Sequence, residues 1–197
     1  MSPAAVPEIL RRLAGCDACL VGPGLGRLPG VRAVTEAVLR EARCPVVLDA
    51  DGLNVLEGAA DALKARRAPT VLTPHDGEFR RLGGAVGPDR MASAAALAQT
   101  LGAVVLLKGH RTVVTDGTRG YENRTGNPGM ATGGSGDVLA GMIASFIAQG
   151  MEPYRAAMCG VHLHGLAGDA AAHRLSQHAM LPSDLLEELG GLFLRLE

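Results

Sequence analysis

Residues 126–141 read GNPGMATGGSGDVLAG, a glycine-rich loop that runs into an acid and then into an apolar helical pattern. Gly133, Gly134 and Gly136 allow the backbone to turn several N–H groups toward one point with no side chain in the way. A helix predicted over residues 135–149 adds the positive end of its dipole to the same point. The stretch therefore predicts a cradle for an anion.

Asp137 places a carboxylate inside this predicted cradle. A carboxylate beside a bound anion is repelled unless a cation or a proton-transfer role accounts for it. General base for an attacking hydroxyl group is the natural role. A glycine-rich turn alone can also simply cap a helix, so the choice between an anion site and a plain cap depends on the other motifs of the chain.

The whole sixteen-residue string resembles the loop of the ADP-dependent NAD(P)H-hydrate dehydratases, a branch of the ribokinase-like superfamily. Its GSGD end is shared with the sugar and vitamin kinases of that superfamily. Far fewer families carry the longer string NPGMATGGSGDVLAG, and it points to the dehydratases.

The chain has 197 residues, of which 47% are hydrophobic and 20% charged, with a net charge of −1. This length predicts a single domain, residues 1–197, with an ordinary core. Scattered charges and few aromatic residues argue against a nucleic-acid surface. No apolar run approaches the roughly 18 residues of a membrane span, and the start lacks a signal-peptide core. We expect no membrane partner and a cytoplasmic protein.

Short β-rich runs alternate with helical stretches up to residue 123. We predict strands over residues 18–21, 46–50, 70–72, 103–107, 112–115 and 120–123. Predicted helices cover residues 30–42, 59–65, 76–82, 89–101, 135–149, 153–172 and 182–194. Short, continuously apolar runs such as Val46-Val47-Leu48 are typical of parallel strands covered on both faces. The pattern predicts a three-layer α/β fold with a mostly parallel central sheet, ending in a hairpin at Asp116-Gly117.

Ligands of open parallel sheets bind beyond the carboxyl ends of the strands, and two early strand ends carry unusual residues. Residues 21–26 read VGPGLG, where glycines allow close approach to a ligand, although a plain strand-to-helix turn explains them equally. Residues 47–54 read VLDADGLN. Its two acids could orient a ribose, a metal-bound water or each other, whereas Asp51 could instead be a helix N-cap.

Two later strand ends add basic and titratable side chains. Residues 72–79 read LTPHDGEF, in which His75 could contact a ligand and Glu78 could hold a Mg²⁺-bound water. Thr73 or Asp76 could equally be caps of the following helix. Residues 107–112 read LKGHRT, and a lysine and an arginine around a glycine suit nucleotide phosphates. A basic surface turn is the alternative.

Two further patterns invite a metal or redox assignment and do not support it. Cys16 and Cys19 form a C-x-x-C that leads into a strand rather than a helix, with no second pair for a zinc site. His162 and His164 lie two apart on a predicted helix and point about 200° from each other. We therefore expect neither a redox motif nor a metal bound directly by protein side chains.

All four strand-end segments resemble those of the dehydratase family, in the same order, between Val6 and Leu194. Gly52 stands where the family usually has alanine, which we expect to loosen the turn. Asp76 replaces the usual proline, which we expect to make that loop more flexible. The resemblance implies that the hydrated nicotinamide nucleotide contacts Gly24, His75 and Asp137. It implies that the adenine nucleotide contacts Lys108, Gly109, His110, Arg111, Thr112 and Gly136.

The implied activity is repair of hydrated NADH or NADPH, with ADP or ATP as the phosphoryl donor and Mg²⁺ as the metal. Asp137 would accept the proton of the C6 hydroxyl as its oxygen attacks the terminal phosphate. The N–H groups of Gly134, Ser135 and Gly136 would form the anion hole. Two alternatives stay open: a hydroxyethylthiazole kinase-like small-molecule kinase, and a non-catalytic nucleotide-binding remnant.

Members of the resembled family usually carry several dozen more residues before the GPGLG segment, including a strand, a helix and a loop over the substrate. We expect this chain to expose a strand edge and apolar surface, and therefore to form a homo-oligomer. Substrate binding should depend more on that segment than the adenine and phosphate sites do.

Overall fold

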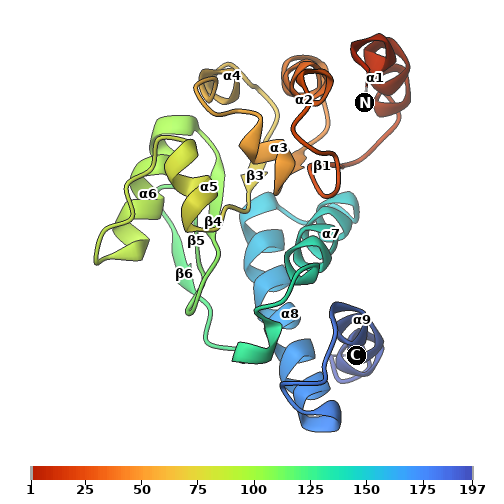
Figure 1. Cartoon of the computed structure of the whole chain (residues 1–197), viewed down its shortest axis with the longest axis vertical. Helices are drawn as coiled ribbons and strands as arrows, with labels where there is room; N and C mark the ends of the chain where they lie inside the picture. The colour runs from red at the N-terminus through yellow and green to blue at the C-terminus, as the bar shows by residue number, and fades with distance from the viewer. Residues whose placement is uncertain (1, 197) are drawn as a thin grey trace.

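The computed structural model describes residues 2–196 as three layers, with a sheet between two layers of helices (Figure 1). The sheet has the order β1-β2-β3-β4-β5-β6. Its first four strands are parallel, and the last two join them in an antiparallel manner. The strands are β1 (Cys19–Val21), β2 (Val46–Leu48), β3 (Thr70–Leu72), β4 (Val104–Leu107), β5 (Val113–Thr115) and β6 (Gly120–Glu122). The predicted fold class is confirmed, and each predicted strand is present with slightly shorter ends.

The parallel register aligns apolar residues across the sheet so that each row faces one helical layer. Leu20, Val47, Val71 and Val104 form one such row and belong to the core beneath the C-terminal helices. The neighbouring row, which begins with Val21 and Leu48, belongs to the other core. This alternation follows from side chains that point to opposite faces at successive strand positions. It explains why these strands read as continuously apolar.

The N-terminal helices cover one face of the sheet, and the helices after residue 134 cover the other (Figure 1). The first layer holds α1 (Val6–Leu13), α2 (Pro29–Glu41), α3 (Asp51–Asn54), α4 (Asp61–Lys64), α5 (Asp76–Arg81) and α6 (Arg90–Leu101). The second holds α7 (Ser135–Ala148) and α8 (Pro153–Leu175), and α9 (Pro182–Phe193) packs on α8. Short 3₁₀ turns, η1 (Pro3–Ala5) and η2 (Pro128–Met130), complete the elements.

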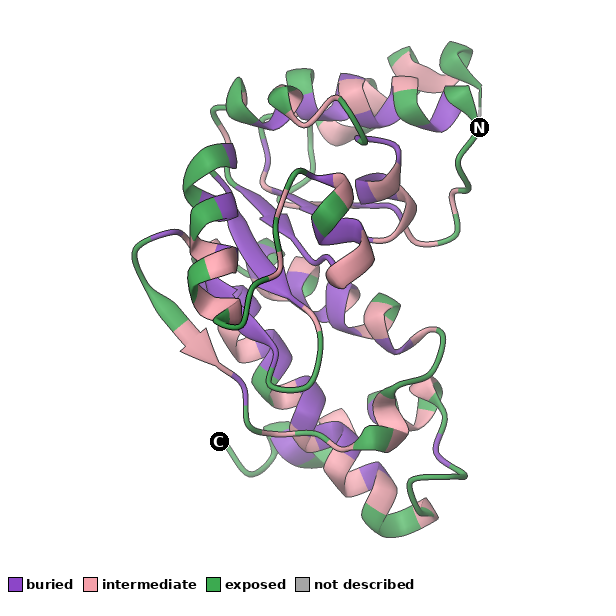
Figure 2. Cartoon of the chain, turned by 60° about the vertical axis from the view of Figure 1, so that its left-hand side comes forward, coloured by how far each residue is buried: buried purple, intermediate pink, exposed green. Residues whose placement is uncertain are grey.

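Buried residues gather in the sheet and on the inner faces of the helices, while outer helix faces are exposed (Figure 2). Phe79, Leu39 and Ile143 are among the largest side chains that are completely buried. Each such side chain contributes about 1.5–3 kcal/mol relative to an exposed position. The two cores hold the strands firmly, so the loops that follow them are presented from a rigid base.

Helix α1 is the main element that the sequence pattern did not predict. It spans eight residues and carries a proline at its second position. Its apolar side chains, including Ile9 and Leu13, pack against the core below α2. Because isolated helices of this length are marginal in water, tertiary packing stabilises α1 rather than a strong local pattern.

None of the helices within residues 2–196 is long and apolar enough to span a membrane. Strand β1 pairs with β2 alone among the described strands, so it forms one edge of the sheet.

Candidate nucleotide and substrate site

The carboxyl ends of β1 and β2 approach each other so closely that only glycine fits between them. A Cβ at Gly22 would lie 1.7 Å from the carbonyl oxygen of Asp49, and Gly22 has a φ of +139°. A Cβ at Gly52 would lie 2.4 Å from the carbonyl oxygen of Val21. Gly52 therefore allows close packing of the two strand ends in this chain, a function that the expectation of a loosened turn missed.

The GPGLG loop is fastened to the next strand end by Asp51. The N–H of Gly26 donates to Oδ2 of Asp51 at 2.8 Å, and Nε of Arg27 lies 3.5 Å from Oδ1. Asp51 is the first residue of α3, and the N-cap position belongs to Ala50, so the predicted N-cap alternative is wrong. Gly24 lies in this loop with a φ of +69° and open space around its Cα. The Asp51 carboxylate thus fixes the position of this loop beside the end of β2.

A buried charged cluster joins the ends of β2, β3 and β4. Nζ of Lys108 lies 2.6 Å from Oδ1 of Asp49 and 3.8 Å from Oε2 of Glu78. The Asp49 and Glu78 side chains are 1% and 4% exposed, and that of Lys108 is 21% exposed. Thr73 donates a hydrogen bond of 2.8 Å to the same Oδ1. Two acidic side chains therefore surround one lysine at these strand ends.

His75 and Glu78 form a capping box at the start of α5. Nδ1 of His75 accepts a hydrogen bond from the N–H of Gly77, and Glu78 accepts one from the N–H of His75. The His75 side chain is more than half exposed, so its outer face remains available to a ligand. The alternative that Thr73 or Asp76 caps this helix is wrong, because His75 itself is the cap. A polar helix cap and a ligand contact are compatible at this position.

The first turn of α7 lies directly beside the charged cluster. A Cβ on Gly136 would lie 3.4 Å from Nζ of Lys108 and 3.8 Å from Oδ2 of Asp49. Gly134 is the N-cap with a left-handed φ of +96°, and among the described residues no side chain caps this turn, although the N–H of Ser135 donates to the carbonyl oxygen of Thr132 at 3.3 Å. An ammonium group and an uncapped helix N-terminus therefore converge on one place. Such an arrangement is typical of sites that bind anions.

Two contacts from α8 hold the glycine-rich loop in place. Asp169 accepts hydrogen bonds from the N–H of Gly126 at 2.9 Å and from Nδ2 of Asn127 at 3.0 Å. His164 is buried, and its Nε2 lies 2.9 Å from the carbonyl oxygen of Ser135, to which it donates. Burial lowers the pKa of His164 to about 4, so the ring is neutral at physiological pH. These side chains therefore support the glycine-rich loop.

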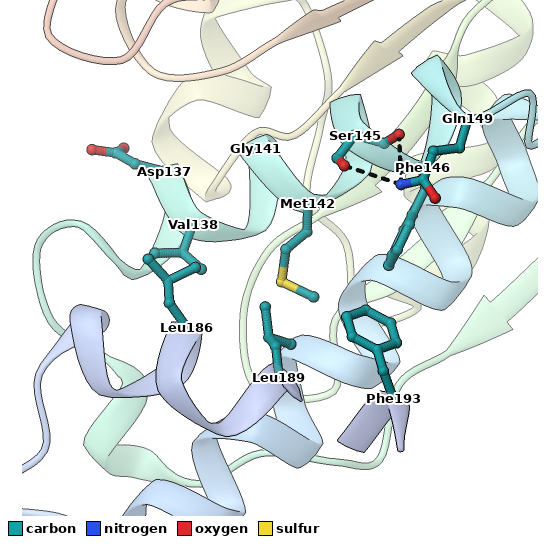
Figure 3. Close-up of a pocket in the computed structure, with 10 residues that line it drawn as sticks. All are labelled: Asp137, Val138, Gly141, Met142, Ser145, Phe146, Gln149, Leu186, Leu189 and Phe193. Atoms are coloured by element: carbon teal, nitrogen blue, oxygen red, sulfur yellow. Dashed lines mark hydrogen bonds between the residues drawn. The ribbon is translucent and has the colours of Figure 1, made fainter. Parts of the chain in front are cut away.

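Asp137 lies in the first turn of α7 and is exposed. It marks the rim of a groove of about 710 Å³ between α7 and α9 (Figure 3). Apolar side chains line most of this groove, namely Val138, Met142, Phe146, Leu186, Leu189 and Phe193. Figure 3 shows the Asp137 carboxylate at one end of the groove, away from this apolar lining.

The loop after β4 has a defined turn of its own. Oγ1 of Thr112 donates to the carbonyl oxygen of Gly109 at 2.9 Å, and Arg111 adopts a left-handed φ of +56°. His110 and Arg111 are exposed, and within the described residues no hydrogen bond or ion pair connects them to Asp137. The structure therefore brings Lys108, Gly136, Glu78 and the α7 N-terminus together. No hydrogen bond or ion pair within residues 2–196 joins His110 or Arg111 to this group, and Arg111 pairs instead with Glu122.

Two contributors to the site were not among the predicted site residues. Asp49 is the direct partner of Lys108, although its motif had been noted. Arg90 donates to Asp76 and to the carbonyl oxygen of Lys108, both at 2.8 Å. Neither contact leaves a signal in the sequence, because the paired residues are far apart along the chain. Asp76 thus gains an anchor that a proline could not provide.

The residues present fit a magnesium ion that is carried by nucleotide phosphates. Within residues 2–196, no three His, Cys, Asp or Glu side chains are grouped so that they could hold a metal alone. Oδ2 of Asp49, however, is buried without a hydrogen-bond partner, and Glu78 lies on the other side of Lys108. Mg²⁺ commonly binds one or two carboxylates together with substrate phosphates and water. Asp49 and Glu78 are the side chains that would hold it.

The chain has four cysteines, namely Cys16, Cys19, Cys44 and Cys159. All four are free, and burial raises the pKa of Cys19 to about 11, so its thiol stays protonated.

The fold defines a ribokinase-like α/β protein, and the helix N-terminus of α7 lies at the carboxyl ends of its strands beside Lys108. A ribokinase-like superfamily protein from Enterococcus faecalis has the same fold, with a TM-score of 0.84, 28% identity, and coverage of 99% of this chain and 69% of that chain. A hydroxyethylthiazole kinase from Pyrococcus horikoshii shares the fold at 22% identity and a TM-score of 0.72, over 93% of this chain and 74% of that one.

The NAD(P)H-hydrate dehydratase family matches residues 3–190, and the chain belongs to this family. The bifunctional NAD(P)H-hydrate repair enzyme Nnr of Moorella thermoacetica is 45% identical over 203 residues, which cover all of this chain and 38% of that protein. The ADP/ATP-dependent NAD(P)H-hydrate dehydratase of Bacillus subtilis, co-crystallised with ATP and Mg²⁺, matches with a TM-score of 0.81 and 32% identity, over 95% of this chain and 70% of that one. The chain spans little more than a third of the length of the curated relatives it matches.

Proposed function

We propose that this protein dehydrates hydrated NADH or NADPH at the expense of ADP or ATP. The observation that carries the proposal is the convergence of the Lys108 ammonium and the uncapped α7 N-terminus beside Asp137, since a Cβ on Gly136 would lie only 3.4 Å from Nζ of Lys108. A base, a cation and an anion hole in one place suit phosphoryl transfer to a hydroxyl group. Family membership supports the choice of a nicotinamide hydrate as the acceptor.

The chemistry follows from these groups. Hydroxide is a poor leaving group, so the C6 hydroxyl of the hydrate is first phosphorylated. Asp137 accepts the hydroxyl proton while the oxygen attacks the terminal phosphorus of ADP, and the bond from that phosphorus to AMP breaks. The ring nitrogen then expels phosphate from C6, and loss of a proton from C5 restores the double bond of NADH. Mg²⁺ supplies neutralisation of phosphate charge when it is bound.

Each remaining site residue has a role in this proposal. The N–H groups of Gly134, Ser135 and Gly136 stabilise the transferring phosphoryl group. Gly24 and His75 contact the hydrate, and Glu78 holds a water of the metal. The adenine nucleotide is bound by Lys108, Gly109, His110, Arg111, Thr112 and Gly136. We further propose that residues 1–197 act as one cytoplasmic domain that forms a homo-oligomer and binds no nucleic acid or membrane.

The test is recovery of reduced-nicotinamide absorbance from chemically hydrated NADH, with ADP and Mg²⁺, and chromatography of AMP and phosphate. Asp137→Asn should reduce the rate by about 100-fold or more. The matched control is Asp17→Asn, an exposed acid in the segment before β1, which should keep full activity.

Failure of the unmodified chain to restore absorbance contradicts the proposal. A phosphorylated product that persists would then indicate a kinase, and nucleotide binding without turnover would indicate a non-catalytic subunit.

A further inference from the structure

Arg90, the first residue of α6, lies between two of the strand-end loops. Its Nη1 donates to Oδ1 of Asp76 at 2.8 Å, and its Nη2 donates to the carbonyl oxygen of Lys108 at 2.8 Å. Asp76 directly follows His75 and begins α5 after the loop that leaves β3, and Lys108 directly follows β4. One planar guanidinium therefore bridges the loop with the proposed hydrate contact and the loop with the proposed nucleotide contacts.

The guanidinium is fitted into this position rather than resting on the surface. A Cβ on Gly109 would lie 2.9 Å from Nη2 of Arg90, so the glycine leaves room for the side chain. Nε of Arg90 is buried, and the side chain as a whole is 25% exposed. The Asp76 side chain is 42% exposed, so this ion pair alone stabilises the fold little. The ion pair matters instead because it fixes the position of the His75 loop relative to the Lys108 loop.

A lysine could not replace this arginine in the same way. The guanidinium directs two N–H groups in fixed directions, whereas an ammonium is a single point charge on a flexible stem. A second link between the loops is the backbone bond from the N–H of Lys108 to the carbonyl oxygen of Pro74, at 2.8 Å. That bond survives substitution of Arg90, so the loops stay together while the side-chain link is removed.

We propose that Arg90 is a positioning residue that couples the two loops, so that a nucleotide on the Lys108 loop and a nicotinamide ligand on the His75 loop strengthen each other's binding. The identity of the two ligands rests on the proposed function. A nucleotide that orders the Lys108 carbonyl fixes Arg90, and Arg90 fixes Asp76 beside the capping residue of α5. Coupling of this kind is reciprocal between the two ligands.

The experiment measures the Kd of ADP with Mg²⁺ by calorimetry, with and without NADH, which is a product and does not react. The ratio of the two constants is the coupling factor, expected to be on the order of 10-fold in the unmodified chain. Arg90→Met, Arg90→Lys and Asp76→Ala should each bring it close to one. The double variant Arg90→Met with Asp76→Ala should fall no further, because both changes break one link.

The matched control is Arg81→Met. Arg81 lies on α5 and donates to Asn54 on α3 at 2.8 Å, and no hydrogen bond or ion pair within the described residues joins it to the Lys108 loop. Its coupling factor should equal that of the unmodified chain. A coupling factor that is unchanged by Arg90→Met and Asp76→Ala, or that falls equally with Arg81→Met, overturns the proposal.

A second readout separates this proposal from the proposed function. ADP should slow amide hydrogen exchange at Gly77 and Glu78, which lie in the His75 loop, and Arg90→Met should abolish that slowing. The measurement needs no nicotinamide ligand, so it decides the role of Arg90 even if hydrated NADH is not the substrate. Exchange that ADP slows equally in Arg90→Met overturns the proposal.

Discussion

At the scale of single residues, helix stability favours alanine at position 136, whereas the proposed nucleotide binding requires glycine there. Gly136 lies in the first turn of α7, where alanine is a better helix former by about 0.5–1 kcal/mol. A methyl group there would nevertheless lie 3.4 Å from Nζ of Lys108, in the space where we propose that a nucleotide phosphate binds. Stability and nucleotide affinity should therefore respond to Gly136→Ala with opposite signs.

We expect Gly136→Ala to raise the urea midpoint slightly and to raise the Kd of ADP by about 10-fold or more, the effect of losing one hydrogen bond to a charged group. Gly141→Ala, in the middle of the same helix with open space around its Cα, is the control and should change stability alone. Equal ADP affinity in both variants would show that phosphate does not bind at this turn.

At the scale of elements, the support of α7 by α8 makes the site sensitive to acid. His164 donates from α8 to the carbonyl oxygen of Ser135, and burial lowers its pKa from 6.5 to about 4. Above pH 6.5 the ring is neutral in both the folded and the unfolded chain. Between pH 6.5 and 4 only the unfolded chain binds the proton, so the free energy of unfolding falls as the pH falls.

The loss attributable to His164 is about 2 kcal/mol between pH 7 and pH 5. His164→Gln keeps a donor for Ser135 but does not titrate, so its stability should change less over the same interval. Urea unfolding at the two pH values measures this difference, with His162→Gln, an exposed neighbour on α8, as the control. An identical pH dependence for the unmodified chain and His164→Gln would contradict this assignment.

Strands and the main helices were predictable because their apolar residues follow a local period. Val46-Val47-Leu48 is completely buried, as its continuous apolar run predicts. The anion site stays a prediction, and the sequence suggests it because the glycines and Asp137 are contiguous in the chain. Lys108 was predicted to bind phosphate, yet its partner Asp49 comes from another strand. Long-range pairs such as Arg90 with the Lys108 carbonyl depend on tertiary packing and leave no periodic signal.

At the scale of the whole molecule, two unpartnered features lie on the α7 side of the structure. Strand β1 is an edge of the described sheet, and α7 packs against β1 and β2. The groove between α7 and α9 leaves Leu186 54% exposed and Phe193 38% exposed. Apolar patches with an adjacent strand edge favour association with another chain.

We therefore expect the purified chain to self-associate reversibly, with the groove between α7 and α9 in the interface. Leu186→Glu should raise the dissociation constant by at least about 10-fold, since a buried leucine contributes about 1.5–3 kcal/mol. Sedimentation velocity over a range of concentrations measures the effect. Leu28→Glu is the matched control, because Leu28 is 64% exposed just before α2 and does not line the groove. A monomer at every concentration, or equal weakening by both variants, would refute this interface.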